Sequence, residues 1–312
     1  MDPIHLNKIL YDIVLLIIMF VAFIIFKYVV VPFQTGFYCD DYSINMEFKE
    51  STVSNSVLIV LILPVPFLFM IITEIFRTAY MKFKHSKLSL HNKYRIIIKK
   101  DRIIHLNEQF GNLLINFGAY SFGLLCNLII TLIGKKTIGR LRPNFLSVCK
   151  PSINPYKELC NTQVTGRTFL IPGFHFDCLE IDMNKINESR KSFPSGHSSS
   201  SFYAMIFLIL YVHKFWNKRN LGFVPQFFQF LMFTTAWYVA LSRVTDNKHH
   251  PTDVLAGSIL GTLLAGFTFY YLNLFYRRYN FRLKYDASND GLKKIDFVES
   301  SNLRNSNGIK QV

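Results

Sequence analysis

Long runs of apolar residues, separated by polar segments, dominate the pattern along most of this chain. The runs approach or exceed the ~20 residues that a helix needs to cross the hydrocarbon core of a bilayer. Backbone polar groups inside a bilayer must be satisfied within each spanning segment, which favours helices. The pattern therefore predicts an all-α, polytopic integral membrane protein with six transmembrane helices, at residues 9–33, 57–76, 113–134, 198–212, 223–241 and 253–276.

The second run contains Pro64 and Pro66. Proline inside a helix removes a hydrogen bond and crowds the preceding turn, so we expect a kink there. No repeat or separate soluble domain is visible, and residues 1–284 are expected to form one six-span domain. Residues 285–312 are polar and rich in Asn and Ser. They predict a cytosolic, disordered tail.

The loops differ in charge, and this difference predicts how the chain is oriented. Nine Lys and Arg residues lie in 77–108, and more follow at 214–219 and 277–284. The positive-inside rule places these segments and the N-terminus in the cytosol. The remaining loops, 34–56, 135–196 and 242–252, are then expected to face the outside of the cell or a lumen.

The formal net charge of +15 does not by itself indicate a nucleic-acid partner. The cations lie mostly in loops, and no zinc-finger or base-stacking signature accompanies them. Membrane orientation and anionic lipids explain them better. The 135–196 loop is basic although it is predicted to lie outside, which favours a functional reason. We therefore expect a bilayer and an anionic ligand as partners, with no nucleic acid, and leave a homo-oligomer open.

The segment 242–253 reads SRVTDNKHHPTD and has the composition of a catalytic site. If Pro251 begins a helix, as proline favours, His249 lies just before it and Asp253 is close enough to accept a hydrogen bond from one ring nitrogen. The other nitrogen is then free to attack a substrate. Arg243 can hold an anion in front of it, because its planar fork matches phosphate oxygens.

Two further segments carry residues suited to binding an anion. The outer loop opens with KKTIGRLRP, in which Lys135 and Arg142 are separated by six residues. It ends with FPSGHSSSS, where Ser195 and Gly196 precede the fourth span. The N–H groups at a helix start bind anions, and glycine permits a close approach. His197 can donate a proton to the bound anion, whereas Ser195 has the alternative role of a helix N-cap.

Six-span topology brings all three segments to the same, non-cytosolic face of the membrane. No cluster of carboxylates suited to Mg²⁺ accompanies them. Because the cations can themselves neutralise a phosphoryl group, we expect phosphoryl transfer without a metal or any other cofactor.

The motifs KxxxxxxRP, PSGH and SRxxxxxHxxxD, in this order, resemble the three-part signature of the type 2 phosphatidic acid phosphatases. The stretches GRLRPNFLSVC and ALSRVTDNKHHPTDVLAG are most similar to the animal lipid phosphate phosphatases, including the Wunen proteins. The signature positions match without substitution, and the resemblance covers about the first 280 residues.

The resemblance implies a role for each motif residue. His249 attacks phosphorus to form a phosphohistidine, Asp253 orients it, and His197 protonates the leaving alkoxide and then activates water. The adjacent His250 falls outside the pattern. The phosphoryl oxygens are expected to be held by Lys135, Arg142, Ser195, Gly196 and Arg243.

A site at the headgroup level of the bilayer fits phosphatidate, lysophosphatidate, sphingosine 1-phosphate or ceramide 1-phosphate, and the sequence does not choose among them. Two alternatives stay open. One is a non-enzymatic lipid-phosphate binding or uptake protein, which needs the cations but no nucleophile. The other is a polyprenyl diphosphate phosphatase. The expected location is the plasma membrane, with the endoplasmic reticulum and Golgi as alternatives.

The same outer loops carry signals of an oxidising compartment. Asn187 lies in the only N-x-S/T sequon, so we expect a glycan there. Four of the five cysteines lie in these loops, where disulfides form, although the sequence does not give the pairing. Cys126 is expected to be a small buried residue of the third span.

Overall fold

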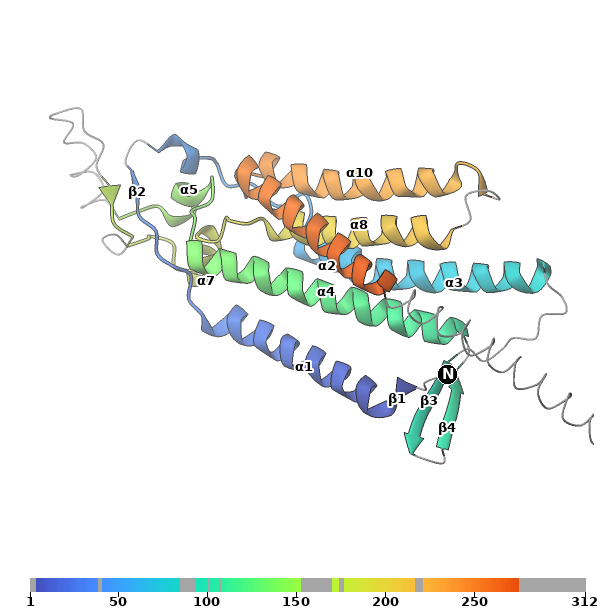
Figure 1. Cartoon of the computed structure of the whole chain (residues 1–312). Coiled ribbons are helices and arrows are strands. Elements are labelled where there is room, and N and C mark those ends of the chain that lie inside the picture. The colour runs from blue at the N-terminus through green and yellow to red at the C-terminus, as the bar shows by residue number, and fades with distance from the viewer. Residues whose placement is uncertain are drawn as a thin grey trace, which may run out of the picture.

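The computed structural model describes residues 4–38, 41–84, 94–99, 102–106, 108–152, 170–173, 177–216 and 221–274. The predicted tail at 285–312 lies outside these residues. The main helices lie side by side in an elongated bundle (Figure 1). They are α1 (Leu6–Val29), α2 (Asn55–Ile62), α3 (Pro64–Lys84), α4 (Glu108–Ile138), α8 (Gly196–Phe215), α10 (Val224–Thr245) and the unlabelled 251–274 helix (Pro251–Leu274).

Among the described residues, four helical segments are long and apolar enough to cross a membrane: Ile9–Val29, Asn55–Ala79, Gln109–Ile138 and Pro251–Leu274. The predicted fourth and fifth spans form as α8 and α10, but neither is among these four. Helix α8 can carry polar side chains because of its position in the bundle. It contacts α10, α4, α2 and α3, and its serines at 198–201 are at most 1% exposed. The polar side chains of α8 therefore face protein rather than lipid.

The second predicted span is interrupted at its prolines, as expected. Helix α2 ends at Ile62 and α3 begins at Pro64. Because Pro66 has no N–H, the carbonyl of Ile62 loses its partner four residues along the helix. The hydroxyl of Tyr120 donates to this carbonyl instead, at 2.6 Å. A neighbouring helix thus satisfies the backbone group that the proline leaves free.

Short strands and helices lie in the connections at the two ends of the bundle. Strands β1 (Ile4–His5), β3 (Tyr94–Lys99) and β4 (Arg102–Leu106) form a sheet near the N-terminus, with β1 parallel and β4 antiparallel to β3 (Figure 1). The sequence analysis did not predict these strands. The opposite end carries the antiparallel pair β2 (Phe37–Tyr38) and β5 (Leu170–Ile171), and the short helices α5 (Phe145–Cys149) and α7 (Met183–Ser189).

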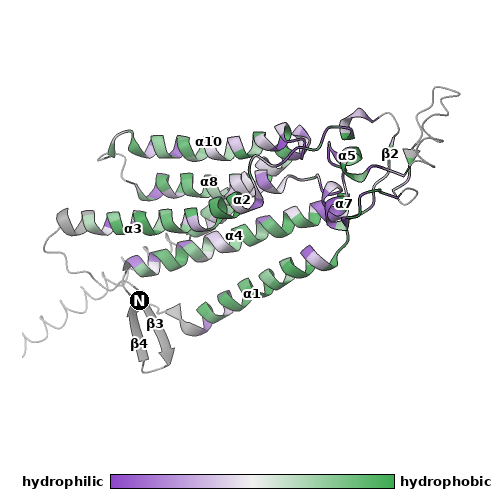
Figure 2. Ribbon diagram, turned by 180° about the vertical axis from the view of Figure 1, so that it is seen from behind, coloured by the Kyte–Doolittle hydropathy of each residue, from purple (hydrophilic) through white to green (hydrophobic). Residues whose placement is uncertain are grey.

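Hydrophobic side chains cover the outside of the bundle, and polar residues gather at one end. Figure 2 shows apolar colouring along the helices and polar colouring at the end that carries α5 and α7. In α1, for example, Ile17 and Ile18 are 56% and 60% exposed. Such exposure of large aliphatic side chains suits hydrocarbon rather than water. The chain is a multi-pass membrane protein, with its polar loops collected away from the apolar belt.

The 251–274 helix packs closely on α8 because glycines face the contact. A Cβ on Gly257 would lie 2.5 Å from the carbonyl oxygen of Ser195, and one on Gly261 would lie 2.2 Å from that of Ser199. These oxygens belong to backbone, which cannot move aside. The close approach holds the start of α8 against the start of the 251–274 helix.

We expect Gly261→Ala to destabilise the protein because the added methyl group forces the two helices apart. Overpacking of this kind costs about 1–3 kcal/mol. A thermal unfolding curve in detergent should show a lower midpoint. Gly266→Ala is the matched control, since nothing lies within 4 Å of the added Cβ in the same helix. An equal effect of both substitutions would contradict this account of the helix contact.

Candidate active site

The three predicted motif segments meet at one end of the bundle. The backbone N–H of Ser195 donates to the carbonyl of Asp253 at 3.0 Å, and that of Ser192 donates to Arg140 at 2.9 Å. The N–H of Arg142 donates to Ser189 at 2.8 Å. These hydrogen bonds join the end of α4, the start of α8 and the start of the 251–274 helix. The predicted convergence of the three segments is confirmed.

His249 lies in a tight turn between α10 and the 251–274 helix. The N–H groups of Lys248 and His249 both donate to the carbonyl of Arg243, at 3.1 and 3.2 Å. Asn247 has a φ of 55°, in the left-handed region that asparagine tolerates. The turn buries the imidazole, which is only 3% exposed.

The ring of His249 is oriented by a backbone carbonyl. Its Nδ1 lies 2.7 Å from the carbonyl oxygen of Ser192. A carbonyl oxygen only accepts, so the proton of the neutral imidazole resides on Nδ1, and Nε2 keeps its lone pair. Burial, reinforced by the charges of Arg142 and Lys135, holds the pKa of His249 well below its ordinary value. The ring is therefore neutral at physiological pH.

The structure corrects the expected contact between Asp253 and His249. The carboxylate of Asp253 instead accepts from Arg140 Nη1 and from the hydroxyl of Ser192, both at 2.5 Å. It also accepts from the backbone N–H of His250 at 3.1 Å. Asp253 lies in the first turn of its helix, so its carboxylate turns back to cap the helix start.

Asp253 thus reaches the predicted nucleophile through Ser192. The hydroxyl of Ser192 bonds to Asp253 while its carbonyl bonds to His249, and Ser192 is fully buried. Arg140, whose second contact is Thr252 Oγ1 at 2.8 Å, completes the network. From the sequence, Arg140 is one of the cations of the KKTIGRLRP segment that could bind a phosphate, whereas Ser192 has no assigned role. The only sequence signal of Ser192 is its position next to the FPSGH motif.

His197 is the second residue of α8, and its Nε2 is buried without a hydrogen-bond partner among the described residues. An unpaired buried nitrogen is costly in a folded protein unless a ligand uses it. The charge of His197 is among the influences that lower the pKa of His249, after burial and the nearby cations. The two histidines therefore share one polar site.

Lys135 and Gly196 are in contact at the start of α8. A Cβ on Gly196 would lie 3.3 Å from Lys135 Nζ. The ammonium group therefore lies against the helix N-terminus, where free N–H groups attract anions. Ser195 has the structural role that the sequence left open. It is the N-cap, its hydroxyl accepts from the N–H of Ser198, and its own N–H is bonded to Asp253.

The two predicted arginines are held by carboxylates that the sequence analysis did not single out. Arg142 Nη2 lies 3.2 Å from Glu188, and Arg243 Nη2 lies 2.8 Å from Asp246. Arg243 is only 1% exposed. Burial alone would raise the pKa of Glu188, but the charges of Lys135, Arg142 and Lys191 outweigh it and lower that pKa to about 2. These carboxylates keep the arginine forks in place without a bound anion.

The 34–56 loop closes over this region, which the sequence analysis also missed. Thr52 donates to Asp246 from its N–H at 2.9 Å and from its hydroxyl at 2.6 Å. The side-chain amide of Asn247 donates to the carbonyl of Glu47 at 3.0 Å. The loop is thus tied to the turn that carries His249, by contacts far apart in sequence.

The 135–196 loop is stabilised by a disulfide between Cys149 and Cys178. Cys126 is free, whereas Cys39 and Cys160 lie outside the described residues. Asn187 lies half-buried in α7. Within the described ranges, no group of three His, Cys, Asp or Glu side chains has the arrangement of a metal site.

A model of the PAP2 superfamily matches residues 116–277, which is more than half of the chain and includes all three motif segments. The chain belongs to the PAP2 superfamily. No solved structure matches this PAP2 chain.

Several curated PAP2 relatives are similar over most of this chain. A putative phosphatidate phosphatase of Drosophila melanogaster is 34% identical over 75% of the chain and 60% of its own length. Phospholipid phosphatase 1 of Rattus norvegicus is 32% identical over 88% of both proteins. Phospholipid phosphatase 2 of the same species is 30% identical over 86% of the chain and 87% of its own length.

Proposed function

We propose that this protein is an integral membrane lipid phosphate phosphatase that forms a phosphohistidine on His249 and uses no metal. Its substrates are phosphomonoesters such as phosphatidate, lysophosphatidate, sphingosine 1-phosphate and ceramide 1-phosphate. The supporting observation is a buried, neutral imidazole whose Nδ1 lies 2.7 Å from a carbonyl, in a site rich in cations. The names of the relatives support the same chemistry.

In the proposed first step, the lone pair on Nε2 of His249 attacks phosphorus, and the bond between phosphorus and the lipid oxygen breaks. The electron pair of that bond goes to the lipid oxygen, which takes a proton from His197. In the second step, His197 accepts a proton from water as the water oxygen attacks phosphorus. The P–N bond then breaks, and its electron pair returns to His249.

Three cations and a helix start are proposed to stabilise the phosphoryl group in both steps. Lys135 and the N–H groups at Gly196 lie together, while Arg142 and Arg243 are held by their carboxylate partners. Preorganised donors of this kind stabilise developing charge without having to reorganise during the reaction. Asp253 is a positioning residue, since it acts through Ser192.

We also propose six spans, with α8 crossing the bilayer inside the bundle and α10 at its surface, and a site that faces the outside of the cell or a lumen. The basic loops predicted at the other end support this orientation. The plasma membrane is the proposed location. On this orientation Asn187 is exposed to the glycosylation machinery. A band that shifts on endoglycosidase treatment, and is absent in Asn187→Gln, would support the orientation, whereas a C-terminal epitope accessible on intact cells would contradict it.

The function is tested by phosphate release from lysophosphatidate with purified protein in EDTA. We expect the rate in EDTA to equal the rate without chelator, because the cations replace a metal. A rate abolished by EDTA and restored by Mg²⁺ would contradict the metal-free mechanism. No release from any of the four proposed lipid phosphates would contradict the enzymatic function and favour capture or transport.

The low pKa of His249 predicts a particular pH dependence. A histidine with a lowered pKa becomes protonated only at a pH below the ordinary value of ~6.5. The fall of kcat/KM on the acid side of the pH profile, its acid limb, should therefore lie below pH ~6.5. Arg142→Gln removes a positive charge that lowers this pKa, so the limb should move to higher pH as activity falls. A profile measured with lysophosphatidate between pH 4 and 8 checks the position of the limb. An unmoved limb in Arg142→Gln would show that His249 is not the titrating group.

A further inference from the structure

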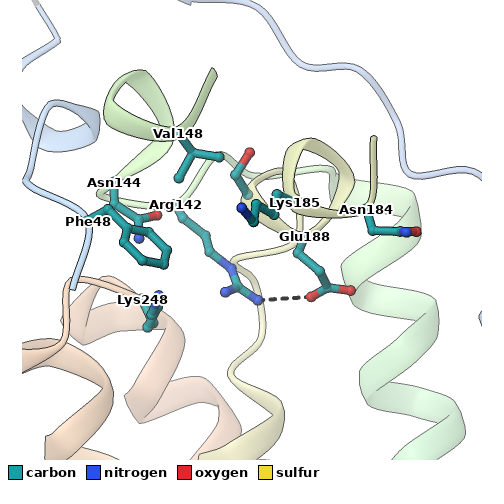
Figure 3. Close-up of a pocket in the computed structure, with 9 residues that line it drawn as sticks. Phe48, Arg142, Asn144, Val148, Asn184, Lys185, Glu188 and Lys248 are labelled. Carbon is teal, nitrogen blue, oxygen red and sulfur yellow. Dashed lines mark hydrogen bonds and ion pairs between the residues drawn. The ribbon is translucent and has the colours of Figure 1, made fainter. Parts of the chain in front are cut away.

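A cavity of about 240 Å³ is lined by Arg142 and by Lys248, the residue that precedes His249 (Figure 3). Of the residues predicted to bind phosphate, only Arg142 lines it. The other lining side chains come from the 34–56 loop, from α5 and α7, and from the turn before His249, and include Phe48, Asn144, Glu188 and Lys248. The cavity therefore adjoins the proposed phosphate site and shares one arginine with it.

Arg142 links the two sites electrostatically. Burial, and after it the positive charge of Arg142, lowers the pKa of both His249 and Lys248, the latter to about 8. The guanidinium group therefore acts on the nucleophile and on the cavity. Figure 3 shows it between Lys248 and Glu188.

Lys248 is a buried cation without a carboxylate partner. It is 8% exposed, and its Nζ lies 3.8 Å from the ring centroid of Phe48. Within the part of the chain that the structure describes, no carboxylate lies within ion-pair distance of this ammonium group. A cation–π contact compensates only part of the desolvation of a buried ammonium. The remaining cost favours an anion in the cavity.

Two more polar atoms at the cavity have no partner among the described residues. Asn144 is 2% exposed, and its Oδ1 is buried without a hydrogen bond. Arg142 Nε is also buried and unpaired. The cavity thus offers donors from Arg142 and Lys248 and an acceptor from Asn144, while the Glu188 carboxylate that also lines it is already paired with Arg142 and Lys191. A phosphate monoanion matches this set, because it carries both charged oxygens and a P–OH group.

We propose that this cavity binds a second phosphoryl oxyanion, held by Lys248, Arg142 and Asn144, next to the phosphoryl group at His249. Two sources have this chemistry. One is the orthophosphate product on its way to water. The other is the proximal phosphate of a lipid diphosphate, which belongs to the leaving group when His249 attacks the distal phosphorus and the P–O–P bond breaks. The proposal deepens the proposed function and rests on it.

The test compares wild type with Lys248→Met, using Lys150→Met as the control, since Lys150 is an exposed cation of the neighbouring 135–196 loop and does not line the cavity. Each purified protein is assayed with lysophosphatidate, with farnesyl diphosphate, and with lysophosphatidate plus added orthophosphate. Loss of one charge-assisted contact to an oxyanion should lower kcat/KM for farnesyl diphosphate, or weaken inhibition by orthophosphate, about tenfold. Turnover of lysophosphatidate without added phosphate should stay within about twofold, since Lys248 does not contact that phosphoryl group.

The outcomes separate the two sources. A tenfold lower kcat/KM for farnesyl diphosphate alone would identify the proximal phosphate of a diphosphate substrate. A tenfold weaker inhibition by orthophosphate alone would identify the product. If both constants are unchanged in a folded Lys248→Met protein, the proposal is wrong. Asn144→Asp, which places a negative charge in the cavity, should have the same effect if Lys248→Met does not fold.

Failure of the proposed function is distinguished by a measurement that needs no turnover. We expect orthophosphate to raise the thermal unfolding midpoint of wild type more than that of Lys248→Met, with chloride as the salt control. This difference holds even if wild type hydrolyses no lipid phosphate. Equal stabilisation of wild type and Lys248→Met by orthophosphate would overturn the second site.

Discussion

Replacing His249 with alanine is expected to lower kcat for lysophosphatidate by at least ~10⁴-fold, because no other group can take over the attack on phosphorus. The Nε2 atom is directed by the bond between Nδ1 and the carbonyl of Ser192, at 2.7 Å. A water molecule in the vacated space lacks this orientation and remains a weak nucleophile. The cations stay in place, so binding of the lipid phosphate should change much less than kcat.

His250→Gln is the matched control for this experiment. His250 is adjacent in sequence and also buried, but its Nε2 lies 3.1 Å from the carbonyl of Leu141, so the ring serves to tie two loops together. Glutamine can keep a donor near that carbonyl, and we expect activity within about tenfold of wild type. An equal loss in both variants would show that damage to the turn, rather than loss of a nucleophile, explains the effect.

The covalent intermediate gives a second measurement. Wild type quenched during turnover of ³²P-labelled lysophosphatidate should carry acid-labile label, as phosphohistidine does, and His249→Ala should carry none. Label that persists in His249→Ala would place the nucleophile elsewhere. Label in wild type, together with normal substrate binding by the variant, would establish the two-step mechanism.

Asp253→Asn is expected to have the second largest effect, a fall in kcat of about 10²-fold with little change in KM. Its carboxylate is fully buried and paired with Arg140 at 2.5 Å, so the substitution leaves a cation without its counterion. The Arg140 side chain is 39% exposed, so water partly screens the unpaired cation, and the disturbance is smaller than the ~3–5 kcal/mol of a fully buried pair. The disturbance reaches His249 through Ser192, and misplacement of a reacting group by ~1 Å can cost about 10²-fold in rate.

A double-mutant cycle tests this indirect route. Ser192→Ala removes the hydroxyl that bonds to Asp253 but keeps the carbonyl that bonds to His249. We expect a smaller loss of about tenfold for this variant, and a coupling energy of at least ~1 kcal/mol between the two substitutions. Additive effects on kcat would contradict the network. In that case Asp253 would act on His249 directly during turnover, as its spacing in the sequence suggested.

The sequence alone determined where the helices form and which residues gather at one end of them. Apolar runs predict the helices, and the even number of crossings expected between the motif segments predicts a shared end of the bundle. Residues Lys135, Arg142, Ser195, Gly196, His197, Arg243, His249 and Asp253 all lie on the segments that meet there. The kink at Pro64 and Pro66 also followed from sequence, because a missing N–H acts locally whatever the surroundings are.

Only the tertiary structure decided which partner each of these side chains has. The spacing of four residues between His249 and Asp253 places them near one another, but it does not say where the carboxylate turns. The path of the 135–196 loop brings Ser192 and Arg140 to Asp253, and the carbonyl of Ser192 to His249. These contacts join residues more than 50 positions apart, so no local pattern predicts them.

The tertiary structure also explains two features that hydropathy alone does not. Helix α8 coincides with a predicted span although four serines lie near its start, and the structure shows these serines buried against neighbouring helices. In the sequence, Lys248 is an ordinary charged residue of a loop. In the structure, the 34–56 loop places the ring of Phe48 beside its ammonium group. Local composition sets the helices of this protein, whereas packing between distant segments sets the dielectric surroundings, and with them the chemistry, of its charged groups.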